Sequence, residues 1–157
     1  MTRRVFLLVV WLAASASLVA QDWPAFRGAN AAGVADGKPT PTKWNAATGE
    51  NVLWKTMLPG AGNSSPVVWR DRVFLTTARD GGRRLSVLAF RRDNGALEWE
   101  TPMPDGASSG AHFKNGYASA TPATDGQRLY VSFGSRGLFA LDTRRRLSRG
   151  ARAGSPA

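Results

Sequence analysis

The only histidine of the chain, His112, lies in a short polar run together with Lys114 and Asn115. Imidazole, ammonium and amide groups on one loop could contact an anionic or carbonyl-bearing ligand. A site built from several histidines is excluded, because catalytic clusters and zinc sites of that kind need more than one imidazole. We interpret the run as a solvent-facing connector or a loop that bonds to the next structural unit. A binding loop is the alternative interpretation.

Four acidic residues have spacings that could serve acid–base chemistry. Asp71 and Asp80 flank one expected strand, and Glu98 and Glu100 alternate around Trp99. Paired carboxylates do such work only where their surroundings separate their pKa values. Residues two apart in a strand share one face of a sheet, and many arginines lie nearby in the sequence. We interpret these acids as a solvated, ion-pairing face.

Other motifs that could carry chemistry lack the partners they need. Ser64-Ser65 and Ser108-Ser109 have no histidine at a spacing that suits an activated serine. Gly28, Gly33 and Gly37 form no phosphate loop, because no strand leads in and no helix leads out. Cysteine is absent, which excludes disulfides, thiolate metal sites and cysteine nucleophiles. The sequence therefore predicts no catalytic residue, no metal site and no bound cofactor, and it leaves any cofactor-binding residue unknown.

The formal net charge of +10 is concentrated at the two ends of the chain. Arg3 and Arg4 stand near the start, and the last stretch holds five arginines and no acid after Asp142. A basic run near a terminus is typical of a solvated tail. We interpret residues 143–157 as a disordered basic tail and expect no binding to nucleic acid.

Residues 1–20 have the order of a secretory signal peptide. Thr2-Arg3-Arg4 precedes an unbroken apolar run over residues 5–14, and small residues follow. Even counted to Ala20 the segment is shorter than the roughly 20 residues that cross a bilayer. Cleavage after Ala20 would release Gln21, and Ala14-Ser15-Ala16 offers an earlier site. An uncleaved anchor and a buried helix are the alternatives. We therefore expect an exported, periplasmic or extracellular protein with no stable membrane anchor after cleavage.

The remaining chain predicts an all-β fold. Residues 21–50 show no period and form an extended N-terminal arm. Short apolar runs bounded by Gly, Asn and Asp turns then indicate strands within residues 51–142. We predict strands at Asn51–Thr56, Pro66–Trp69, Arg72–Thr77, Leu85–Phe90, Leu97–Thr101, Thr121–Thr124, Arg128–Phe133 and Leu138–Asp142.

Two stretches of this strand-rich part match each other without a gap. Ser65–Thr76 aligns with Thr121–Ser132 at a constant offset of 56 positions. Repeats of short strands indicate propeller blades or a solenoid, because one unit cannot bury its own apolar faces.

The end of the repeat resembles the pyrroloquinoline-quinone-like (PQQ-like) repeat of β-propellers. Residues 88–99 read Leu-Ala-Phe-Arg-Arg-Asp-Asn-Gly-Ala-Leu-Glu-Trp, and Phe139-Ala140-Leu141-Asp142 repeats part of this motif. The arm that begins at Asp22-Trp23-Pro24 is similar to the start of exported bacterial members. The sequence departs from the pattern at Arg91, where the repeat usually has Asp, and after Asp142 the pattern is lost.

The resemblance implies a partial β-propeller of four-stranded antiparallel blades, with about one complete blade and parts of two others. Trp54 and Trp99 would be large plates that dock one blade onto the next. A truncated or frameshifted reading frame would explain the sudden end of the pattern, and a short protein that oligomerises is the alternative.

For function, the resemblance implies a non-catalytic scaffold or binding module with an unknown protein or polysaccharide partner. The family contains an outer-membrane assembly factor that is usually lipid-anchored, a modification that this cysteine-free chain cannot carry. One alternative is a fragment of a quinoprotein oxidoreductase, whose tryptophan floor, metal site and catalytic Asp are not visible here. Another is a polysaccharide- or peptide-binding surface protein.

Overall fold

The structure is a computed structural model that describes residues 21–35, 40–106, 108, 110 and 115–144. The leader 1–20, His112, Lys114 and residues 145–157 lie outside these described residues. The helical segments of the described part are three single 3-10 turns, η1 (Ala29–Ala31), η2 (Asp80–Gly82) and η3 (Gly134–Arg136). No helix among the described residues is long and apolar enough to cross a membrane.

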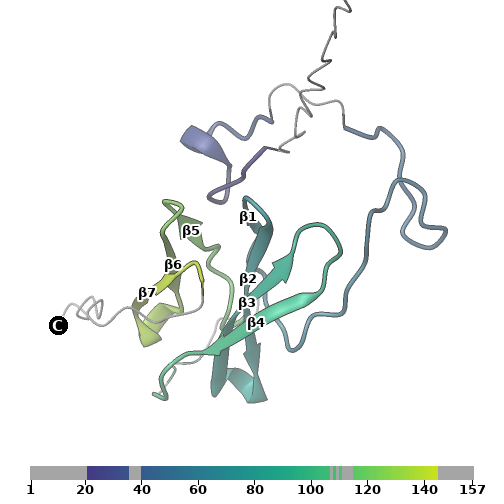
Figure 1. The fold of residues 1–157 in the computed structure, drawn as a ribbon. Coiled ribbons are helices and arrows are strands. Elements are labelled where there is room, and N and C mark those ends of the chain that lie inside the picture. The colour runs from purple at the N-terminus through teal and green to yellow at the C-terminus, as the bar shows by residue number, and fades with distance from the viewer. Residues whose placement is uncertain (1–20, 36–39, 107, 109, 111–114, 145–157) are drawn as a thin grey trace, which may run out of the picture.

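The first sheet is a four-stranded antiparallel meander in the order β1-β2-β3-β4 (Figure 1). Tight connections join its strands because their residues accept a positive φ: Gly95, between β3 and β4, has φ 70°. The strands are β1 (Val67–Trp69), β2 (Arg72–Arg79), β3 (Arg84–Arg91) and β4 (Leu97–Pro102). The four strands predicted here from the sequence are confirmed, with β2 and β3 slightly longer than expected.

The second sheet contains three described strands, again antiparallel, in the order β5-β6-β7. They are β5 (Ala123–Thr124), β6 (Arg128–Ser132) and β7 (Leu138–Asp142). The repeat is visible in the register, since Val67 pairs with Phe74 and Ala123 pairs with Tyr130, 56 positions later. The prediction of an all-β fold is therefore confirmed. Of the predicted one complete blade and parts of two others, the described residues form the complete blade and one partial blade.

The two sheets face each other across a shared apolar core (Figure 1). Trp99 is 6% exposed in this core, and its ring centroid lies 5.9 Å from that of Phe74. The cluster draws on both sheets because apolar residues alternate along their strands. Its buried members are Val67, Phe74, Ala78, Leu85, Val87, Ala89, Trp99, Met103, Ala118, Leu129, Val131, Phe133 and Leu141.

The strand predicted at Asn51–Thr56 is wrong for this structure. These residues belong to neither sheet, and they cross the face of the first sheet that points away from the second. Trp54 fixes the segment there, because its indole N–H donates to the Arg92 carbonyl at 2.8 Å. The four strands of the first sheet pair with one another in sequence order. Residues 51–56 contact this sheet through the side chain of Trp54.

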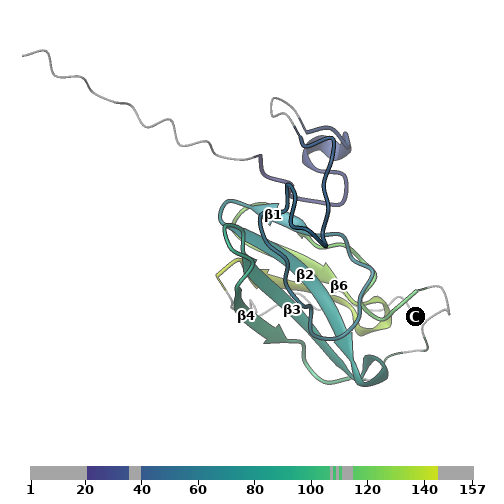
Figure 2. The ribbon, with the colours of Figure 1, turned by 90° about the vertical axis from the view of Figure 1, so that its right-hand side faces the viewer.

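The N-terminal arm ties the two sheets together at their first strands. Trp23 forms an antiparallel bridge with Val68 of β1, and the carbonyl of Pro24 accepts the Thr124 amide of β5 at 2.8 Å. Asp22 accepts the backbone N–H of Arg70 at 2.6 Å. The η1 turn then rises beyond the β1 end of the sheets (Figure 2). Residues 22–24 therefore act as a clip across the joint.

Candidate binding pocket at the joint of the two sheets

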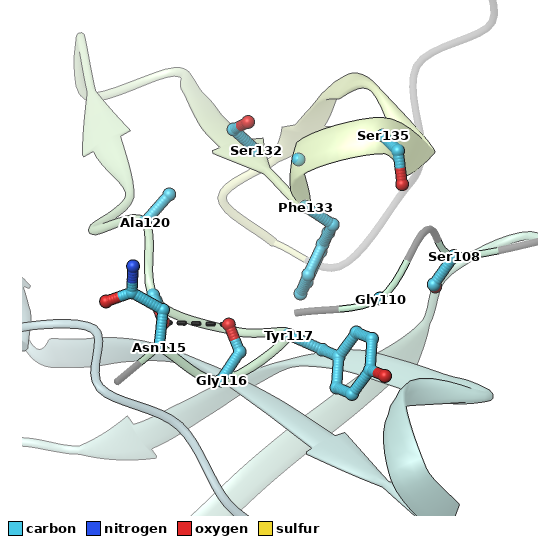
Figure 3. A pocket seen from close by; sticks show the side chains of 11 residues that line it. Ser108, Gly110, Asn115, Gly116, Tyr117, Ala120, Ser132, Phe133 and Ser135 are labelled. Carbon is cyan, nitrogen blue, oxygen red and sulfur yellow. Dashed lines mark hydrogen bonds between the residues drawn. The ribbon is translucent and has the colours of Figure 1, made fainter. Parts of the chain in front are cut away.

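A pocket of about 290 Å³ lies where the connector from β4 to β5 meets the end of β6 and the η3 turn (Figure 3). Phe133 points into this space from above Gly116 and Tyr117 in the view of Figure 3, and the amide of Asn115 lies to one side. The lining residues are Ser108, Gly110, Asn115, Gly116, Tyr117, Ser119, Ala120, Ser132, Phe133, Gly134 and Ser135.

The floor of the pocket is fixed by close packing around residues 117–118. A Cβ atom on Gly82 would lie 2.3–2.5 Å from the Tyr117 ring, so only glycine allows this contact. The buried carbonyl of Ala118 accepts the amides of Asn63 and Ser64 at 3.0 and 3.2 Å. The connector is thus pinned between η2 and the loop that precedes β1, which makes this part of the pocket preformed.

Arg136 holds the other wall. Its guanidinium donates to the Pro104 carbonyl, to Ser108 Oγ at 3.4 Å and to the Arg83 carbonyl at 3.5 Å. One side chain of η3 therefore fastens the connector to the start of β3. The sequence indicated only a turn at residues 134–137, because the partners of Arg136 are 28 to 53 positions away.

The described lining is neutral, and its polar side-chain groups are serine hydroxyls, one carboxamide and the hydroxyl of Tyr117. Two aromatic side chains, Tyr117 and Phe133, supply apolar surface beside them. Such a lining can bind a ligand by hydrogen bonds and by packing against the aromatic rings. Ligand pockets commonly combine apolar surface with a few polar groups in this way.

Of the three polar residues for which the sequence leaves a binding loop as the alternative, Asn115 lines the pocket and is exposed. His112 and Lys114 lie outside the described residues. Two of the serines that the sequence singled out have side-chain partners: Ser64 Oγ accepts the Thr76 amide at 3.2 Å, and Ser108 Oγ donates to the Gly82 carbonyl at 3.2 Å. Ser109 lies outside the described residues.

The expected ion-pairing face is confirmed. Arg72 donates to both carboxylate oxygens of Glu98 at 2.8 and 2.7 Å, and Arg79 does the same to Glu100 at 2.8 and 3.0 Å. These hydrogen bonds from Arg79 hold the pKa of Glu100 below its usual value of 4.5. Bidentate pairs of this geometry place one charge-assisted hydrogen bond on each carboxylate oxygen.

The two other acids of that set also meet arginines. Asp71 lies 3.1 Å from Arg72, and Asp80 lies 2.5 Å from Arg84, its partner four positions along. No group of three or more acidic or histidine side chains in the described part is placed to hold a metal ion.

Arg91, which departs from the repeat pattern, forms a side-chain hydrogen bond within its own turn. Arg91 donates to both oxygens of Asp93, at 3.0 and 2.5 Å, and these hydrogen bonds lower the pKa of Asp93. In the second sheet Asp142 occupies the equivalent position and accepts the Arg144 amide at 2.6 Å. Both turns therefore have a side-chain hydrogen bond, made by different residue types.

Comparison with known proteins supports the repeat assignment. Residues 9–149 match the sequence family described as "Outer membrane protein assembly factor BamB", which is built from PQQ-like repeats. A search of curated proteins found no match, and a search of solved structures found none either. The match covers both sheets, the arm and the clip, so the chain belongs to this family of PQQ-like repeat proteins.

Proposed function

We propose that this chain is a non-catalytic binding module of an exported β-propeller protein, working in the periplasm or outside the cell. The pocket between the connector and η3, whose lining is neutral among the described residues, is the observation that carries the proposal. Its hydroxyl, amide and aromatic groups suit recognition of an uncharged polar ligand. The acidic residues that could have served acid–base chemistry are engaged by arginines instead.

The partner that best fits this pocket is an extended segment of another protein. Serine and asparagine side chains match the alternating donors and acceptors of a peptide backbone, and Phe133 and Tyr117 provide contact for apolar side chains. The family description refers to assembly of outer-membrane proteins, which agrees with binding of protein chains. A neutral polysaccharide is the rival ligand.

Chemical-shift titration of the isotope-labelled full chain can test the ligand class. The first probes are extended synthetic peptides with alternating apolar and polar residues, and the second are neutral oligosaccharides. We expect the peptides to shift the amides of the pocket lining. Asn115→Ala should weaken binding roughly 2- to 10-fold, as the loss of one hydrogen bond predicts. Gln127→Ala, which removes an exposed carboxamide outside the described lining of this pocket, should bind as the parent chain does.

Shifts with the oligosaccharides alone would show that the proposed ligand class is wrong. The non-catalytic assignment has a separate test, which is dye reduction with added pyrroloquinoline quinone, Ca²⁺ and an alcohol or sugar. Turnover in that assay would favour the quinoprotein oxidoreductase interpretation.

A further inference from the structure

The chain contains two Asn-Gly pairs, Asn94-Gly95 and Asn115-Gly116, and the fold surrounds them differently. An Asn-Gly pair can rearrange without an enzyme, because the backbone nitrogen of the glycine lies within reach of the asparagine carboxamide and no Cβ atom hinders it. Asparagine is for this reason among the thermolabile residues. Whether a given pair reacts in the folded protein depends on how firmly its carboxamide and its glycine amide are held.

The first pair is held in the turn between β3 and β4. The Gly95 amide donates to the Arg91 carbonyl at 2.9 Å, and Asn94 Oδ1 accepts the Ala96 amide at 2.9 Å. Gly95 is also buried, with the Trp54 ring at the place where a Cβ atom would lie. Attack of the Gly95 nitrogen on the Asn94 carboxamide would disrupt both hydrogen bonds, so the native fold protects this pair.

The second pair lies on the connector from β4 to β5, in the lining of the pocket (Figure 3). Asn115 and Gly116 are both exposed. The Gly116 carbonyl accepts Ser119 Oγ at 2.8 Å, but within the described part of the chain neither the Gly116 amide nor the Asn115 carboxamide forms a hydrogen bond. A Cβ atom at Gly116 would meet nothing nearer than Ser119 Oγ at 4.0 Å, apart from its chain neighbours. The carboxamide therefore has room to turn toward the glycine nitrogen.

We propose that Asn115 is a site of spontaneous deamidation in the folded protein and that Asn94 is not. The Gly116 nitrogen loses its proton to a base from solvent and forms a bond to Cγ of Asn115. The Cγ–Nδ2 bond breaks, and the side-chain nitrogen leaves as ammonia with a proton taken from water. Water then opens the cyclic succinimide at either carbonyl, which gives aspartate or isoaspartate. The reaction needs only water and involves no change of oxidation state.

Either product places a carboxylate in a pocket whose described lining is otherwise neutral. Isoaspartate in addition lengthens the main chain of the connector by one methylene group. A new charge alters which ligands a site accepts, because it attracts cationic groups and repels anionic ones. The ligand preference of the pocket would therefore change as the protein ages. This consequence, unlike the reaction itself, rests on the proposed binding function.

Mass spectrometry of the aged protein tests the proposal, with Asn94 as the control within the same chain. The full chain is kept folded in mildly alkaline buffer, and samples taken at intervals are digested at acid pH, where the reaction is slow. We expect Asn115 to be modified at least about tenfold faster than Asn94, because each hydrogen bond that holds the first pair slows the attack several-fold. In concentrated urea both pairs lose their surroundings, and the two rates should approach each other.

Gly116→Ala is the matched variant, because it keeps Asn115 and changes only the attacking residue. The space around Gly116 accepts a Cβ atom, and Gly116 is not among the residues with a positive φ, so the fold should be retained. The added methyl group hinders the approach of the nitrogen to Cγ. We expect deamidation of Asn115 to become at least about tenfold slower, with the rate at Asn94 unchanged. Thermal melts of the variant and the parent verify that both are folded.

Equal rates at Asn94 and Asn115 in the folded chain would overturn the proposal. Slow reaction of both in buffer, with fast reaction of both in urea, would overturn it as well, since the fold would then shield Asn115. An unchanged rate at Asn115 in folded Gly116→Ala would contradict attack by the Gly116 nitrogen. All of these measurements are peptide masses and involve no ligand. A failure here therefore leaves the proposed binding function standing, and a failure of peptide binding leaves the deamidation site standing.

Discussion

At the scale of single residues, Gly95 decides whether Trp54 can sit on the first sheet. Gly95 combines φ 70° with an indole ring where a Cβ atom would be. Gly81 has a similar φ of 63° but open space around it. Gly95→Ala should lower the free energy of unfolding by about 2–4 kcal/mol, because backbone strain and a steric clash add. Gly81→Ala should cost about 1 kcal/mol from backbone strain alone. Chemical denaturation of both variants measures the difference, and equal costs would contradict the contact with Trp54.

The Arg79–Glu100 pair gives stability a dependence on pH. The pKa of Glu100 is lowered in the folded state, chiefly by its hydrogen bonds from Arg79. Its contribution is therefore complete above the unfolded value of 4.5 and is lost as the pH falls through the lower folded value. Both side chains are 27% exposed, so we expect about 0.5–1 kcal/mol. Thermal melts of the parent and of Glu100→Gln are compared at pH 7 and below pH 4.5. The difference in stability between the two proteins should shrink at the acid pH. Glu50→Gln, at an exposed acid outside this pair, is the control for the removal of one negative charge.

At the scale of elements, the clip at residues 22–24 is what couples the arm to both sheets. Asp22→Ala removes the acceptor for the Arg70 amide and the 3.8 Å contact with Arg92. We expect faster hydrogen exchange at Arg70 and Thr124, about tenfold, because loss of one such bond is worth about 1–1.5 kcal/mol. Asp22→Asn retains an acceptor oxygen and should exchange more slowly than the alanine variant. Unchanged exchange in Asp22→Ala would mean that the backbone contacts of Trp23 and Pro24 hold the arm without Asp22.

Trp99 tests the packing between sheets. It is 6% exposed within the shared core, whereas Trp44 in the arm is 70% exposed. Trp99→Ala should cost about 3–5 kcal/mol, the usual range for a large buried aromatic residue. Trp44→Ala should stay within about 0.5 kcal/mol of the parent. A cost below 1 kcal/mol for Trp99→Ala would show that the two sheets do not depend on this side chain.

At the scale of the whole molecule, one core shared by both sheets predicts a single unfolding transition. Leu129 of β6 is fully buried in the same cluster as Phe74 of β2. Leu129→Ala should destabilise by about 2–5 kcal/mol and should reduce exchange protection in both sheets together. Circular dichroism and tryptophan fluorescence should report coincident transitions. Separate transitions would mean that each sheet is stable without the other.

The sequence by itself determined the strands and their repeat. Seven of the eight predicted strands form within about two residues of their expected ends, because the alternation of apolar residues and the Gly and Asp turns act locally. The ion pairs of Glu98 and Glu100 were also predictable, since residues two apart in a strand share a face. The failure at residues 51–56 is instructive: the local pattern is that of a strand, but pairing needs a neighbour that local sequence does not specify.

Only the tertiary structure decided which distant segments meet. The pocket depends on Arg136 reaching Pro104 and Ser108, and on Gly82 lying under Tyr117. The clip depends on Pro24 meeting β5, 100 positions along the chain. These contacts are made to backbone carbonyls and small residues. Such partners produce no periodic pattern in a sequence. The same reason explains why Trp54 could be recognised as a plate from its spacing, while the face that it covers became known only from the fold.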